Sequence, residues 1–130
     1  MTGFRTPLGR ARGLGAAKHG VGHFIAQRVS AIALIFLVLW AVASALTLAH
    51  ADYQAALVWV HAPFNAILSA LLIGVAAFHM KIGMRVIIED YIEEAHPKMA
   101  LLILNLFVAW LVGAVGVFSI LKVAFGGGAF

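Results

Sequence analysis

Of the 130 residues in this chain, 64% are hydrophobic and only 11% are charged, whereas soluble domains have roughly 45–50% apolar and about 25% charged residues. The mean hydropathy of +1.04 is too high for a chain that faces water throughout, so the composition predicts an integral membrane protein in which the net charge of +4 reports orientation rather than a nucleic-acid partner. The absence of cysteine excludes a disulfide framework and an iron–sulfur cluster held by thiolates of this chain.

Three apolar stretches, at about residues 28–49, 63–89 and 99–125, are long enough to cross a hydrocarbon core of ~30 Å as helices. Pro63 suits the first turn of the second helix, and a run of glycines ends the third. We therefore expect an all-α membrane protein with three transmembrane helices. Residues 1–130 form a single membrane-anchor domain in this interpretation, with residues 1–26 as a basic cytoplasmic leader.

Basic residues are distributed unevenly around the first apolar stretch. No lysine or arginine occurs in the connection between the first two stretches. The positive-inside rule then places the N-terminus and the second connection in the cytoplasm, and the C-terminus in the periplasm. Five basic residues and no acidic one precede or open the first stretch: Arg5, Arg10, Arg12, Lys18 and Arg28.

His79 is the first candidate functional residue, because an ionisable side chain inside a span is costly and marks a functional hypothesis. If the second span is centred near Ala76, His79 lies about 4.5 Å from the midplane on the cytoplasmic side. There the imidazole could ligate a haem iron, relay a proton or hydrogen-bond a neighbouring helix. Gly83, one turn later on the same face, permits close approach of a flat ligand or of a second helix.

Asp90 and Tyr91 lie at the cytoplasmic end of the same span. Asp90 follows His79 by eleven residues, which places it about 20° from the His79 face of a helix. Asp90 and Tyr91 could thus line one crevice together with His79, from which they are separated by roughly 17–18 Å along the helix axis. A different face carries a column of charged side chains that we expect to reach the membrane surface and to form an i,i+4 ion pair: Lys81, Arg85 and Glu89.

Arg28 opens the first span, where it could pair with lipid phosphates or hold a carboxylate such as a haem propionate. From its position alone the lipid anchor is favoured. In the third span, small residues and one amide at helical spacing predict close helix packing with a hydrogen-bonding contact from Asn105. The small residues are Ala109, Gly113 and Gly116.

The other histidines carry weaker signals. His19 and His23 stand at i,i+4 and could ligate a metal on a helix, but the glycines around them, including Gly20 and Gly22, argue against a firm helix. We expect a solvated or partner-bound segment there. Surface positions in connections are expected for His50, His61 and His96.

Two motifs resemble one family. The stretch HMKIGMRVIIEDY from His79 to Tyr91 is similar to the pattern H-x-x-x-G-M-x-x-x-x-x-D-Y of the D subunit of succinate dehydrogenase, the smaller hydrophobic anchor of respiratory complex II. The stretch FIAQRVSAIAL from Phe24 resembles that family's F-I-x-x-R-x-[ST]-A-I segment. The resemblance covers nearly the whole chain and implies a non-catalytic subunit of an oxidoreductase in the bacterial inner membrane.

The resemblance also implies roles for the matched residues. His79 would be one axial ligand of haem b, the other being a histidine of the C subunit, a second multispan anchor. Arg28 would lie near a haem propionate. Tyr91 would hydrogen-bond a ubiquinone carbonyl, with Asp90 supporting that site. The flavin and the iron–sulfur clusters would belong to separate flavoprotein and iron–sulfur subunits.

Two other functions remain open at this point. A small proton-coupled transporter subunit would use His79 as a relay, although no acidic residue lies inside an apolar stretch apart from Glu89 at the end of the second, and such carriers usually need one. A cofactor-free membrane assembly protein would use the spans for packing alone. Haem absorption bands in the purified complex would separate both alternatives from the anchor subunit.

Overall fold

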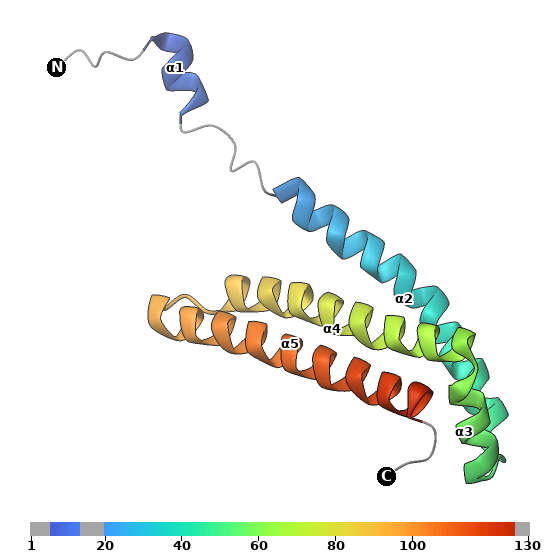
Figure 1. The fold of residues 1–130 in the computed structure, drawn as a ribbon. Coiled ribbons are helices and arrows are strands. Elements are labelled where there is room, and N and C mark those ends of the chain that lie inside the picture. Colours follow the sequence, from blue (N-terminus) through green and yellow to red (C-terminus); the bar gives the residue numbers. More distant parts are fainter. Residues whose placement is uncertain (1–5, 14–19, 127–130) are drawn as a thin grey trace.

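The computed structural model describes residues 6–13 and 20–126, and within these ranges it is helical with no strand. Three of its helices are long and apolar enough to cross a membrane: α2, α4 and α5. The expected all-α fold with three spans is therefore confirmed. The described helices are α1 (Pro7–Arg12), α2 (Gly20–Leu48), α3 (Tyr53–His61), α4 (Pro63–Tyr91) and α5 (Ala95–Phe125) (Figure 1).

The start of α2 differs from the expectation. The helix begins at Gly20 rather than near residue 28, so the glycines do not prevent helix formation around His23. Each glycine costs roughly 1 kcal/mol in a helix, but extending a helix that the apolar stretch has already formed needs no new nucleus. The prediction of a non-helical segment was wrong at His23, whereas His19 lies outside the described residues.

The connection between the first two spans contains the short helix α3, which the sequence analysis did not anticipate. Its N-cap is Asp52, whose side chain accepts a 2.8 Å hydrogen bond from the backbone N–H of Ala55. Trp59 stacks on Trp40 of α2 with ring centroids 5.7 Å apart. This contact fixes α3 against the end of the first span.

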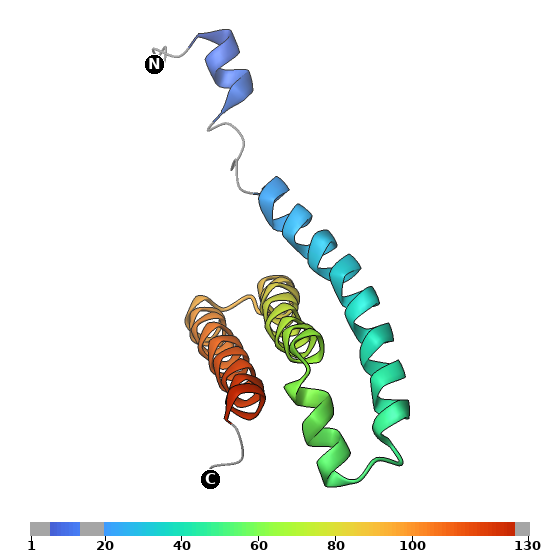
Figure 2. The same ribbon diagram turned by 45° about the vertical axis from the view of Figure 1, so that its right-hand side comes forward.

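Helix α4 lies between α2 and α5 and runs antiparallel to α5 (Figures 1 and 2). Small residues form the contact between α4 and α5, where Ala77 and Ala109 are buried. A Cβ added at Gly113 would stand 3.3 Å from that of Ala77, and one at Gly116 would stand 2.6 Å from Cγ2 of Ile73. The two backbones approach closely because these side chains are small or absent, as predicted for the third span.

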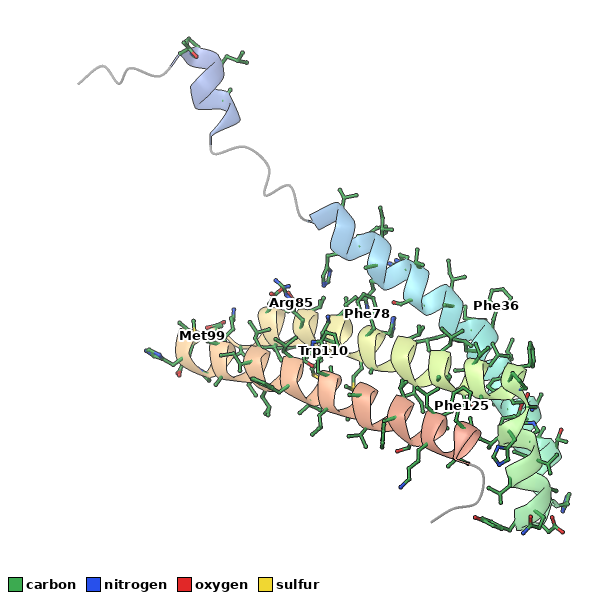
Figure 3. All side chains as sticks on the ribbon, viewed as in Figure 1. Phe36, Phe78, Arg85, Met99, Trp110 and Phe125 are labelled. Carbon is green, nitrogen blue, oxygen red and sulfur yellow. The ribbon has the colours of Figure 1, made fainter. Side chains whose placement is uncertain are left out.

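Little of the apolar surface is buried within the described part of the chain. Ser30 is the buried polar residue, and the buried apolar residues are Leu37, Ala66, Ala77, Ile82, Ile88 and Ala109. Large apolar side chains face outward instead; Phe36, Trp110 and Phe125, labelled in Figure 3, are 70%, 68% and 83% exposed. A surface of this kind suits contact with lipid tails or with other membrane helices.

Candidate functional site

The site is centred on His79, whose imidazole faces α2 from the C-terminal half of α4. Its Nδ1 atom lies 2.8 Å from the hydroxyl oxygen of Ser30, which is only 5% exposed. The same hydroxyl donates a 3.1 Å hydrogen bond to the backbone carbonyl of Gln27, one turn earlier on α2. The His79 ring itself is half-buried, and among the described residues its Nε2 atom makes no hydrogen bond.

A strip of polar side chains on α2 faces this part of α4. His23, Gln27 and Ser30 follow one another at spacings of four and three, and so share one face of the helix. Buried atoms without a hydrogen-bond partner in the described structure are Nε2 of His23 and Oε1 of Gln27. Gly83 lies against the same strip, since a Cβ there would stand 3.7 Å from Nε2 of Gln27. Gly83 therefore lies at the contact between α2 and α4, at a distance that a Cβ would also tolerate.

The sequence analysis missed Gln27 and Ser30 as site residues. Serine and glutamine in a span also occur as ordinary packing contacts, so neither carries a distinctive signal by itself. Two signals were present: Ser30 stands at the [ST] position of the F-I-x-x-R-x-[ST]-A-I segment, and both residues share helical spacing with His23. Neither signal predicts which helix that face meets.

Asp90 and Tyr91 occupy the last turn of α4 and both are exposed, Tyr91 by 80%. Within the described ranges neither side chain makes a hydrogen bond. The crevice expected to join them with His79 is not closed by these helices, because α4 ends here and no other described helix covers the pair. They form an open edge about 18 Å along the helix from His79.

Arg28 does not reach His79. Its guanidinium carbon lies 5.1 Å from the centroid of the Phe24 ring, a cation–π contact, and the residue is exposed. Arg28 precedes the buried Ser30 by two positions and therefore projects from nearly the opposite side of α2. The structure places Arg28 on a surface that is open to lipid or to another chain.

The expected charged column on α4 is present. Nε of Arg85 donates a 2.7 Å hydrogen bond to Oε1 of Glu89, forming the predicted i,i+4 ion pair. These side chains are 57% and 40% exposed, so the pair contributes about 0–1 kcal/mol to stability. Nζ of Lys98 donates to the backbone carbonyl of Glu89, which ties the first turn of α5 to the end of α4.

The remaining described histidines lie at the surface, as expected. His50, His61 and His96 are exposed, and Nδ1 of His61 lies 3.0 Å from the carbonyl oxygen of Ala124. In the described part of the chain, no three histidine or acidic side chains gather to hold a bare metal ion.

These features define a three-span helical membrane protein with a histidine at membrane depth. The model for the family described as succinate dehydrogenase/fumarate reductase transmembrane subunit matches residues 2–115, and the chain belongs to this family. A succinate dehydrogenase hydrophobic membrane anchor subunit from Paracoccus denitrificans is 33% identical over 124 residues, which cover 93% of each chain. One of the same description from Rickettsia bellii is 31% identical over 120 residues, covering 92% of this chain and 88% of the relative.

No solved structure is significantly similar to the chain. The sequence comparisons nevertheless confirm the family resemblance, the multi-pass membrane location and the assignment as a non-catalytic membrane-anchor subunit. They favour this interpretation over a transporter subunit. The roles of His79, Arg28, Asp90 and Tyr91 remain predictions.

Proposed function

We propose that this chain helps to anchor a succinate:ubiquinone oxidoreductase in the bacterial inner membrane, that it supplies His79 as one axial ligand of haem b, and that it forms part of the ubiquinone site. Family membership supports the anchoring role. The observation that carries the haem assignment is the state of the His79 ring: Nδ1 is engaged by Ser30, while Nε2 has no hydrogen-bond partner among the described residues. An imidazole held in this way suits axial ligation.

The residues present fit a haem that is shared with another subunit. This chain would supply the His79 imidazole as one axial ligand, and a second multispan subunit would donate the other histidine. Arg28 is exposed on nearly the opposite side of α2 from Ser30, so it would pair only with a propionate that extends past α2. When bound, the haem supplies one-electron transfer within the membrane.

The proposed ubiquinone site includes Tyr91 and Asp90. Tyr91 would donate a hydrogen bond from its O–H to a quinone carbonyl, and Asp90 would support that group. Both side chains are exposed at the end of α4, so neighbouring subunits must complete an apolar crevice around the quinone. Beside the second anchor subunit, the proposed partners are an iron–sulfur subunit and a flavoprotein subunit, which hold the iron–sulfur clusters and the flavin.

The alanine variant His79→Ala in the complete complex tests the haem assignment. The measurements are the reduced-minus-oxidised absorption spectrum, the haem content per complex and the subunit stoichiometry. We expect haem to be lost or weakly held while the subunits still assemble, because the other helix contacts remain. His96→Ala is the matched control, since His96 is exposed in the first turn of α5. An unchanged bis-histidine spectrum in His79→Ala would reject His79 as the ligand and make His23 the next candidate.

A further inference from the structure

We infer that Ser30 is a positioning residue for His79: its hydroxyl holds the imidazole in one orientation and in the tautomer that leaves Nε2 available to an iron. This inference rests on the proposed ligation of haem b by His79. It assigns a function to Ser30, which stands at the [ST] position of the F-I-x-x-R-x-[ST]-A-I segment and to which the family resemblance gave no role.

The contact joins two helices that are far apart in the sequence. Ser30 and His79 are 49 positions apart, and their side chains meet with Oγ and Nδ1 at 2.8 Å. Ser30 is 5% exposed, so water does not compete for its hydroxyl. At this depth neither lipid tails nor apolar side chains offer a hydrogen bond, and each polar group depends on the other.

Counting hydrogens decides which group donates. A serine hydroxyl has one hydrogen and can accept two hydrogen bonds. That hydrogen points to the backbone carbonyl of Gln27, 3.1 Å away, which leaves the lone pairs of Oγ to face His79. The hydrogen between Oγ and Nδ1 is therefore the one on Nδ1. A neutral imidazole carries one N–H, so Nε2 has a lone pair.

The bond to Gln27 also fixes the serine itself. Because Oγ donates within its own helix, the Ser30 side chain is held in one rotamer, and the acceptor is in place before a ligand binds. A metal-ligating histidine usually donates its other N–H to an acceptor, which orients the ring and makes the ligand more basic. A more basic axial ligand stabilises the ferric haem and so lowers its reduction potential.

A purely structural role of Ser30 is the competing interpretation, since a small residue is also required where α2 meets α4. The two roles respond differently to substitution. Ser30→Ala preserves the small volume and removes the acceptor, whereas Ser30→Thr preserves the hydroxyl and adds a methyl group. Ser30→Cys provides a weak sulfur acceptor.

The test uses these three variants in the complete complex, with Ser44→Ala as the matched control on the same helix, half-buried and fourteen positions further along. The readouts are the haem midpoint potential and the low-spin ferric electron paramagnetic resonance signal. A third readout is the amount of haem that the complex retains during titration with a haem-free protein that binds haem. Subunit stoichiometry reports assembly. For Ser30→Ala we expect a raised midpoint potential, a changed ferric signal and roughly ten- to a hundredfold weaker haem retention.

Ser30→Thr should remain close to the wild type, Ser30→Cys should fall between alanine and wild type, and Ser44→Ala should have no effect. Wild-type potential and ferric signal in Ser30→Ala would overturn the inference. Equal shifts in the alanine and threonine variants would also overturn it, because side-chain size rather than the hydroxyl would then control the haem.

The His79→Ala variant separates this inference from the proposed function. If His79→Ala keeps the bis-histidine haem, the ligand assignment fails, and the inference about Ser30 fails with it. If His79→Ala loses the haem while Ser30→Ala keeps the wild-type potential and signal, only the inference about Ser30 is rejected.

Discussion

The side-chain amide of Asn105 on α5 donates a 2.9 Å hydrogen bond to the backbone carbonyl of Lys81 on α4. Lys81 lies two positions after His79 on α4. The hydrogen bond therefore links the third span to the turn of α4 that carries the proposed haem ligand, and it satisfies an amide that lipid could not.

Replacing Asn105 with alanine should destabilise the packing of α5 on α4. Interhelical hydrogen bonds in membranes contribute about 0.6 kcal/mol on average and up to about 1.7 kcal/mol, so a loss of this size is expected. Thermal unfolding of the purified complex measures it. Ser119→Ala on the same helix is the control, because the Ser119 hydroxyl bonds only to the carbonyl of Val115 within α5. Equal stability of the two variants would mean that the Asn105 contact contributes nothing.

Gly116→Ala should disturb the α4–α5 contact by overpacking. The new Cβ would stand 2.6 Å from Cγ2 of Ile73, so Ile73 or the backbone must move, at a typical cost of about 1–3 kcal/mol. Gly74→Ala is the matched control, since a Cβ there meets nothing within 4 Å. Adding Ile73→Ala to Gly116→Ala should recover part of the loss. Denaturation midpoints of the assembled complex provide the comparison, and a harmless Gly116→Ala would contradict the close approach.

Tyr91→Phe should slow ubiquinone reduction roughly tenfold or more, because it removes one hydrogen bond worth about 1.4 kcal/mol while keeping the ring. Succinate oxidation with an artificial acceptor that takes electrons before the quinone should stay near normal. The other tyrosine supplies the control: Tyr53 opens α3 in the connection at the opposite end of the spans and is 73% exposed. Tyr53→Phe should leave both rates unchanged.

Full ubiquinone reductase activity in Tyr91→Phe would identify the residue as an interfacial anchor, which an aromatic ring at a span end also suits. The quinone site would then lie elsewhere. A parallel loss of both activities would instead indicate damage to the complex as a whole.

Expressed without partner subunits, the chain should not yield a folded monomer with six-coordinate haem. In the proposed site this chain supplies one axial ligand, His79, and large apolar side chains such as Phe36 and Trp110 are exposed. Absorption spectroscopy and size-exclusion chromatography of the chain expressed alone check this expectation. A monodisperse monomer with a bis-histidine spectrum would show that no second subunit is needed for ligation.

Much of the fold was determined by local sequence pattern. A backbone that crosses a membrane must satisfy its hydrogen bonds within its own segment, so apolar length alone predicts the spanning helices. The small residues Ala109, Gly113 and Gly116 predicted close packing of the third span for a similarly local reason: without bulky side chains, two backbones can approach. His79 stood out because an ionisable group at membrane depth is rare.

Other features depended on tertiary packing. Helix α3 has an N-cap at Asp52 and a ring stack between Trp40 and Trp59. The N-cap involves residues that are close in the sequence, whereas the ring stack joins α3 to another helix, α2. No sequence pattern pairs Ser30 with His79, because the pair depends on how α2 meets α4. By itself the sequence determined that an imidazole lies within the second span; the packing of two distant helices decided which of its nitrogens is engaged, since a hydrogen bond over 2.8 Å requires both helices in place.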